Sequence, residues 1–174
     1  VNLQDVVLGN RIASTFQYPN TLAAFLMTLF FITTGKQNIE EKLWKKNLYA
    51  IAGFIMIFTF VFTYSRTAWV LFPIFAIGYL IIIPKAVKVD ILLYYIGVAV
   101  PSVLLLQPFS RYTSNLEGTS PKALATIVIG IVVFMIIYIT TQKLKEKVDT
   151  KHLKLICLLV GAIVITTGIF ATIA

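Results

Sequence analysis

The chain has 174 residues, of which 59% are hydrophobic and only 13% are charged. Soluble globular domains are about half apolar and roughly a quarter charged, so this composition excludes an ordinary soluble domain and indicates an integral membrane protein. The net charge of +8 does not indicate a nucleic-acid partner, because the charges lie in short segments between apolar runs. No signal-peptide pattern opens the chain, and we expect it to be an internal fragment of a longer protein.

Apolar runs that approach the length of a membrane span follow one another along the chain. The run 48–83 contains one charge, Arg66, and as a single helix it would be about 54 Å long, whereas the hydrocarbon core is roughly 30 Å thick. We therefore expect two helices with a tight turn at 64–67. Pro101 is expected to kink the fourth span, and 108–121 to form a polar loop. The sequence predicts an all-α, polytopic membrane protein, one transmembrane domain over 1–174, with about six spans at 21–34, 48–64, 67–83, 91–107, 122–141 and 155–173.

The positive charges predict how these spans are oriented. Eleven lysines and no arginine lie in three alternate segments, which are 36–47, 84–90 and 142–154. The other four positive charges are Arg11, Arg66, Arg111 and Lys122. By the positive-inside rule, the lysine-rich segments face the cytoplasm. The N-terminal segment 1–20, the tight turn and the polar loop then lie outside.

All three arginines are thus expected on the outer side, where the positive-inside rule does not require them. A guanidinium group binds phosphate oxygens in a bidentate way and costs less to desolvate than an ammonium group. Arg66 is the strongest candidate, because apolar runs flank it and no acidic residue lies nearby in the sequence. An arginine at mid-bilayer costs about 2.5–3.5 kcal/mol, and a bound phosphate would supply its missing partner.

The starts of the three inward-running spans carry residues typical of helix N-termini, which attract anions through unpaired N–H groups and the helix dipole. Asn20 and Ser65 mark two of these starts, and Ser120 with Pro121 marks the third. If the three starts converge, they form a cationic pocket at the level of the outer headgroups.

Two short motifs lie at the first two of these starts. Arg-x-x-Ser-x-Phe-x-x-Pro-Asn precedes the first span, and Ser-Arg-x-Ala-Trp stands at the predicted turn. Their order resembles the O-antigen ligase and O-antigen polymerase family of bacterial membrane glycosyltransferases. The resemblance covers mainly residues 8–83, with Arg111 as a looser match. The matching residues are Arg11, Ser14, Phe16, Pro19, Asn20, Ser65, Arg66, Ala68 and Trp69.

The resemblance implies a fragment of a larger, GT-C-like helical bundle in the bacterial inner membrane. Members of the family take a glycan from an undecaprenyl-diphosphate carrier at the outer face and transfer it to a glycan, lipid or protein acceptor. They use no nucleotide sugar, no cofactor and no metal. The residues implied in binding the diphosphate are Arg11, Arg66, Arg111, Ser14, Asn20 and Ser65.

The sequence departs from the family at the catalytic base. A histidine in a large outer loop is the candidate base in the family, but the only histidine here, His152, lies in a segment expected in the cytoplasm. That outer loop would begin beyond Ala174. The catalytic residue is therefore unassigned, and we expect the chain alone to be inactive.

Two other functions stay open. A transporter or flippase for an anionic lipid or solute would use the same outer pocket, although no inverted repeat is evident and only Pro101 suggests a broken helix. In a non-catalytic membrane scaffold, the arginines would only anchor the chain to lipid headgroups. No Walker A, GxGxxG or zinc-binding pattern implicates ATP, NAD or a metal ion.

Overall fold

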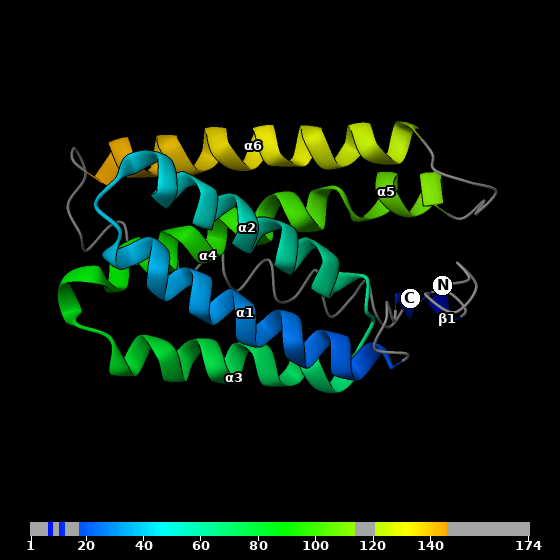
Figure 1. Ribbon diagram of the computed structural model, residues 1–174, viewed down its shortest axis with the longest axis horizontal. Helices are drawn as coiled ribbons and strands as arrows, with labels where there is room; N and C mark the ends of the chain where they lie inside the picture. The colour runs from blue at the N-terminus through cyan, green and yellow to red at the C-terminus, as the bar shows by residue number, and fades with distance from the viewer. Residues whose placement is uncertain (1–6, 9–10, 13–17, 114–120, 146–174) are drawn as a thin grey trace. The chain divides into compact units, whose positions relative to one another are not determined.

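The computed structural model describes residues 7–8, 11–12, 18–113 and 121–145, with side chains for 18–112 and 121–143. These residues are almost wholly helical (Figure 1). The exceptions are the strands β1 (Val7–Leu8) and β2 (Arg11–Ile12), which pair antiparallel, and short turns. The expected all-α class is therefore confirmed for the described part of the chain. The chain divides into two compact units, Val1–Ile83 and Pro84–Ala174.

The first unit contains three long helices. They are α1 (Pro19–Ile39), α2 (Leu43–Val61) and α3 (Arg66–Ile82). Polar side chains inside these helices bond to the backbone of their own helix, as where the Thr34 hydroxyl donates to the Phe30 carbonyl at 2.8 Å. Such bonds satisfy a hydroxyl group that an apolar environment would otherwise leave unpaired.

A tight connection joins α2 to α3. Tyr64 adopts a φ of 47°, in the left-handed region that non-glycine residues rarely occupy, and Ser65 then caps α3. The break that the long apolar run 48–83 required is present, and it lies between Val61 and Arg66.

Aromatic packing fixes the direction of α1 relative to α3. Phe31 of α1 stacks on Phe72 of α3, with ring centroids 5.8 Å apart. Two turns further along α3, a Cβ added at Gly35 of α1 would lie 3.4 Å from the Tyr79 hydroxyl oxygen. Because the contacts advance in the same direction along both helices, α1 and α3 run parallel and begin at the same end of the unit, as Figure 1 shows. Helix α2 runs antiparallel to α1, and the Thr33 hydroxyl reaches the Met56 sulfur at 4.0 Å.

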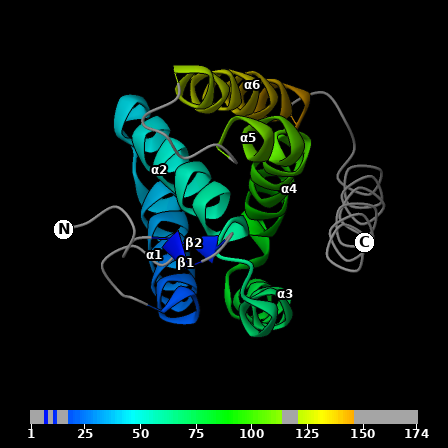
Figure 2. The same ribbon diagram turned by 90° about the vertical axis from the view of Figure 1, so that its right-hand side faces the viewer.

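The described residues of the second unit, 84–113 and 121–145, form a short 3₁₀ turn and three α-helices. They are the 3₁₀ turn η3 (Lys85–Val87), α4 (Lys88–Leu104), α5 (Leu106–Thr113) and α6 (Pro121–Lys145). Helices α4 and α6 pack antiparallel around Tyr94, whose ring lies 6.2 Å from the rings of both Phe134 and Tyr138. Figure 2 shows α5 and α6 from the end at which they approach each other.

Several expected boundaries were wrong. The polar loop expected at 108–121 contains α5, because Pro108 falls in the first turn of that helix, where a missing N–H costs nothing. The helix that corresponds to the fourth expected span, 91–107, ends at Leu104, and it contains Pro101, whose expected kink stays a prediction. The connection expected at 36–47 shrinks to 40–42. The sixth expected span, 155–173, lies outside the described residues.

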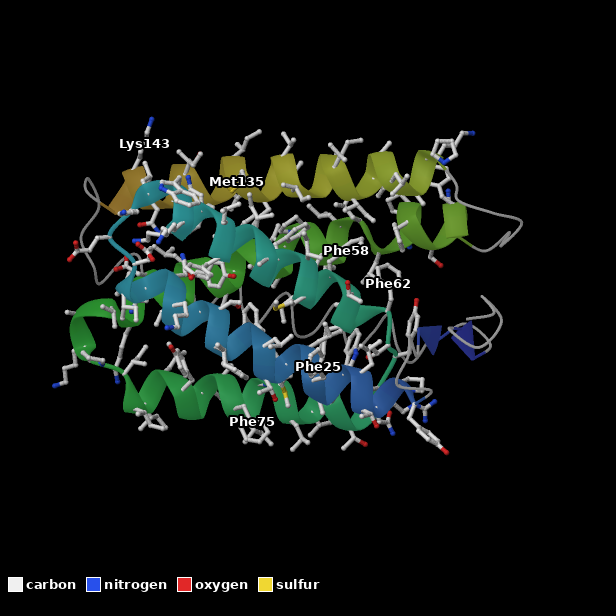
Figure 3. All side chains as sticks on the ribbon, in the orientation of Figure 1. Phe25, Phe58, Phe62, Phe75, Met135 and Lys143 are labelled. Atoms are coloured by element: carbon white, nitrogen blue, oxygen red, sulfur yellow. The ribbon has the colours of Figure 1, made fainter. Side chains whose placement is uncertain are left out.

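Two helical stretches of the described chain, Lys85–Leu104 and Pro121–Lys143, are long and apolar enough to cross a membrane. Helix α3 is apolar but shorter, and polar residues extend into the ends of α1 and α2. Exposed apolar side chains cover much of α3 and α6, and Figure 3 shows Phe75 projecting outward from α3. Large exposed apolar surfaces are typical of contact with lipid or another protein, which supports membrane association. The six spans within one domain stay a prediction.

Candidate functional site

The start of α3 is built by Ser65. Its side chain is fully buried, and its hydroxyl oxygen accepts a hydrogen bond from the backbone N–H of Ala68 at 3.3 Å. Its carbonyl oxygen accepts from the backbone N–H of Trp69 at 3.0 Å. This is the N-cap geometry that serine favours. Ser65 therefore fixes the helix start, and its hydroxyl hydrogen is still able to donate to a further acceptor.

Arg66 is the first residue of α3 and its side chain is exposed. Its guanidinium group forms no hydrogen bond or ion pair with any residue whose side chain the structure describes. The group thus stands at the positive end of the α3 dipole, where two positive potentials add. A cation in this position is unfavourable for the helix alone and is suited to an anion brought from outside.

The start of α1 lies at the same end of the first unit. Ala23 and Ala68 belong to one buried cluster, and they follow Asn20 and Ser65 by three residues each. Because the two helices are parallel, Asn20, Ser65 and Arg66 lie together at this end, which we call the arginine end. Asn20 is exposed, but it is not the N-cap that the sequence suggested. That position belongs to Tyr18, which makes no side-chain cap.

Two further residues of the first motif that were predicted to bind the diphosphate, Arg11 and Ser14, precede α1. Arg11 lies in β2, and only its backbone is described. Ser14 lies outside the described residues. Their contribution to the site stays a prediction.

Trp69 adds a donor to the arginine end that sequence reasoning did not assign. Its ring packs against the buried cluster that contains Ala23, Phe60 and Ala68. The indole N–H is buried and has no hydrogen-bond partner among the described residues. A buried donor without an acceptor costs about 1–3 kcal/mol, so a ligand that accepts this hydrogen bond recovers that cost. The sequence marks Trp69 only by its place one turn after Arg66, because its burial depends on packing against α1 and α2.

Arg111 belongs to the second unit. It is exposed near the end of α5, in a helix rather than the expected loop. The neighbouring Tyr112 ring lies 6.0 Å from the Lys122 ammonium group at the start of α6. Arg111 and Lys122 therefore share one end of the second unit. The expected convergence of Arg111 with Arg66 stays a prediction.

Within each unit, most of the described lysines and the arginine whose side chain is described lie at opposite ends of the helices. In the first unit, Arg66 lies at the arginine end, and the lysines gather where α1 leads into α2. In the second unit, Lys88 begins α4 and Lys143 lies near the end of α6, where Figure 3 shows it extending from the helix. Arg111 lies at the opposite end. Apart from Lys122, which shares an end with Arg111, the described lysines and arginines are thus separated in space inside each unit.

Comparisons with protein family models, with curated proteins and with solved structures find no match. The geometry of the arginine end is therefore the main support for a function. Within the described residues, no group of three or more His, Cys, Asp or Glu side chains is placed to hold a metal ion. The chemistry that this end offers is the binding of an anion by an exposed guanidinium group at a helix N-terminus, with the buried indole N–H one turn further along α3.

Proposed function

We propose that this chain is part of an integral membrane glycosyltransferase of the O-antigen ligase or polymerase type. It binds the diphosphate of an undecaprenyl-diphosphate-linked glycan at the outer face of the bacterial inner membrane, and the glycan is transferred to a glycan, lipid or protein acceptor. The observation that carries the proposal is the position of Arg66. It begins α3 beside the parallel start of α1, with the buried Trp69 N–H one turn behind it.

A diphosphate matches what this end of the unit offers. The guanidinium group of Arg66 binds two phosphate oxygens at once, and the start of α3 adds the positive end of its helix dipole at the same place. The exposed side chain of Asn20 lies at the same end, and the buried Ser65 fixes the helix start from which Arg66 projects. Arg11 and Ser14, from the motif that precedes α1, complete the site in the proposal.

The reaction requires a stabilised leaving group. The bond between the anomeric carbon and the diphosphate oxygen breaks, and that oxygen keeps the electron pair. The acceptor oxygen bonds to the anomeric carbon and gives its proton to a base, which stays unassigned. Fixed donors around the departing diphosphate stabilise its growing charge, and this is the step that Arg66 would accelerate.

Orientation follows the sorting of charges. The arginine end faces the periplasm, together with the segment 1–20, and the lysine-rich ends face the cytoplasm. In this proposed orientation the site is expected at the depth of the lipid carrier's diphosphate, since the carrier's hydrocarbon chain stays in the bilayer.

The test is transfer by the full-length protein in proteoliposomes that contain an undecaprenyl-diphosphate-linked glycan. Arg66→Ala combined with Arg11→Ala is expected to abolish transfer while membrane insertion stays normal. Lys45→Ala, at the opposite end of the first unit, is the matched control and should transfer normally. Retained transfer by the double variant would contradict the proposal. Movement of the lipid or of an anionic solute across the bilayer without a new glycosidic bond would indicate a flippase or transporter instead.

A further inference from the structure

The end of the first unit opposite the arginine end carries a second cationic surface. Helix α1 ends there and α2 begins, and the connection brings together four lysines. We call the stretch 36–49 the lysine tip. Its lysines are Lys36, Lys42, Lys45 and Lys46, and its acidic residues are Glu40 and Glu41.

The lysine tip is also strongly apolar at its surface. Ile39, Leu43 and Trp44 are exposed to 73%, 71% and 62% of their full surface. The ammonium group of Lys45 lies 5.6 Å from the centre of the Trp44 ring, an arrangement in which cation and indole stabilise each other. Exposed apolar groups beside lysines are unfavourable in water. They match the boundary between hydrocarbon and headgroups, where indole rings and lysine side chains are enriched.

An open pocket of about 350 Å³ lies in this tip, and its walls include Lys36, Lys42 and Tyr49. Glu40 and Glu41 also line the pocket. The Glu40 carboxylate accepts a hydrogen bond from the backbone N–H of Lys42 at 3.2 Å, so this acidic group helps to hold the connection between the helices. The pocket walls carry two lysines and two carboxylates, so the excess positive charge of the tip comes from Lys45 and Lys46, which are not among the pocket walls.

We propose that the lysine tip binds the headgroup of an anionic phospholipid from the cytoplasmic leaflet. The lipid phosphate lies at the surface of the tip against its lysines, Lys36 and Lys42 among them, and the exposed side chains of Leu43 and Trp44 contact the acyl chains. A dissolved anion would use the lysines but would leave the apolar surface in water, which is why a lipid fits better. This site is independent of glycan transfer and lies at the other end of the unit from Arg66.

The test measures lipid retention by the full chain, purified in detergent and examined by native mass spectrometry with added phosphatidylglycerol or phosphatidylcholine. The unchanged protein is expected to retain phosphatidylglycerol several-fold more than phosphatidylcholine. The double variant Lys36→Gln with Lys42→Gln should lose most of that preference. The matched control, Lys85→Gln with Lys143→Gln, removes two exposed lysines from the second unit and should keep it.

A charge-preserving variant shows whether the glutamine variant loses lipid because it lacks the charges or because it misfolds. The double variant Lys36→Arg with Lys42→Arg should retain phosphatidylglycerol as the unchanged protein does. Binding of the anionic headgroup here requires two positive charges, and it does not require the specific shape of the lysine ammonium group. Equal loss in the glutamine variant and its control would overturn the proposal, since retention would then follow net charge alone. Displacement of phosphatidylglycerol by excess inorganic phosphate would also overturn it, because the site would then serve a soluble anion.

Discussion

Phe31 of α1 and Phe72 of α3 lie face to face, with ring centroids 5.8 Å apart and ring planes 24° from parallel. Phe72 also lies 5.5 Å from Phe60 of α2, so one ring touches all three helices of the first unit. Together with the approach of Gly35 to Tyr79, this contact shows that α1 and α3 run in the same direction. The parallel direction brings two helix starts, rather than a start and an end, to the place where Arg66 stands.

Two replacements of Arg66 distinguish between two roles for this residue: bidentate binding of a phosphate group, and simple anchoring to lipid headgroups by charge. Arg66→Ala is expected to lower glycan transfer by about 100-fold or more, which is the usual effect of removing one donor from a leaving-group site. Arg66→Lys keeps the charge and should still lower transfer about tenfold, because an ammonium group lacks the planar fork. The measurement is the rate of transfer in proteoliposomes. If Arg66→Lys transfers as well as the unchanged protein, the arginine is only a headgroup anchor.

Trp69→Phe tests the buried indole N–H without removing the ring. The variant should be as stable as the unchanged protein or slightly more so, because an unpaired buried donor is lost. Its affinity for the lipid-linked donor should fall about tenfold, the loss of one hydrogen bond to a charged group. Thermal unfolding in detergent and donor titration measure the two effects. Unchanged affinity would show that Trp69 serves packing alone.

Ser65 is predicted to act mainly through the helix start. Ser65→Ala should destabilise the protein by about 1 kcal/mol in thermal unfolding, because the Ala68 N–H loses its acceptor. Asn and Asp are equally good N-caps, so both replacements should recover the stability. Only Ser65→Asn should recover donor binding, since the carboxylate of Ser65→Asp would repel a diphosphate. Equal donor binding by both variants would argue against an anion at this end.

Gly97 provides a test of packing in the second unit. A Cβ at this position would lie 3.7 Å from Ile137 and 3.9 Å from Phe134, which are ordinary contacts. Gly97→Ala should therefore be tolerated, with a change of stability within about 1 kcal/mol, because alanine also favours the helix. Gly97→Leu should destabilise α4 against α6 by about 1–3 kcal/mol through overpacking. Similar thermal midpoints for the two variants would show that α4 and α6 do not pack closely here.

Much of the helix layout follows from the sequence, because it depends on local signals. The break before Arg66 was predictable from the length of the apolar run, and the start of α6 at Pro121 from proline's preference for the first helical turn. Helix α5 was missed because Pro108 suggested a loop, although proline is tolerated that early in a helix. The extension of α1 past Lys36 was missed because a charged residue ends an apolar run without ending a helix.

The candidate site was only partly predictable, since it depends on contacts between distant residues. Ser65 and Arg66 stand out in the sequence as a polar pair inside an apolar run. Their position beside the start of α1 depends on the packing of Ala23 against the cluster that holds Ala68. The buried state of the Trp69 N–H arises from the same packing. No local sequence pattern predicts that Arg66 lies beside the start of α1, or that the Trp69 N–H is buried.

The short connection between α2 and α3 has a consequence for binding. Only Phe62, Thr63, Tyr64 and Ser65 separate the two helices, and all but Tyr64 are buried. The backbone of Arg66 is therefore held rigidly to the end of α2 before any ligand arrives, so this part of the site is pre-organised. The backbone therefore loses its conformational entropy when the protein folds, and not when an anion binds. At Arg66, binding of an anion then costs only the conformational entropy of the arginine side chain.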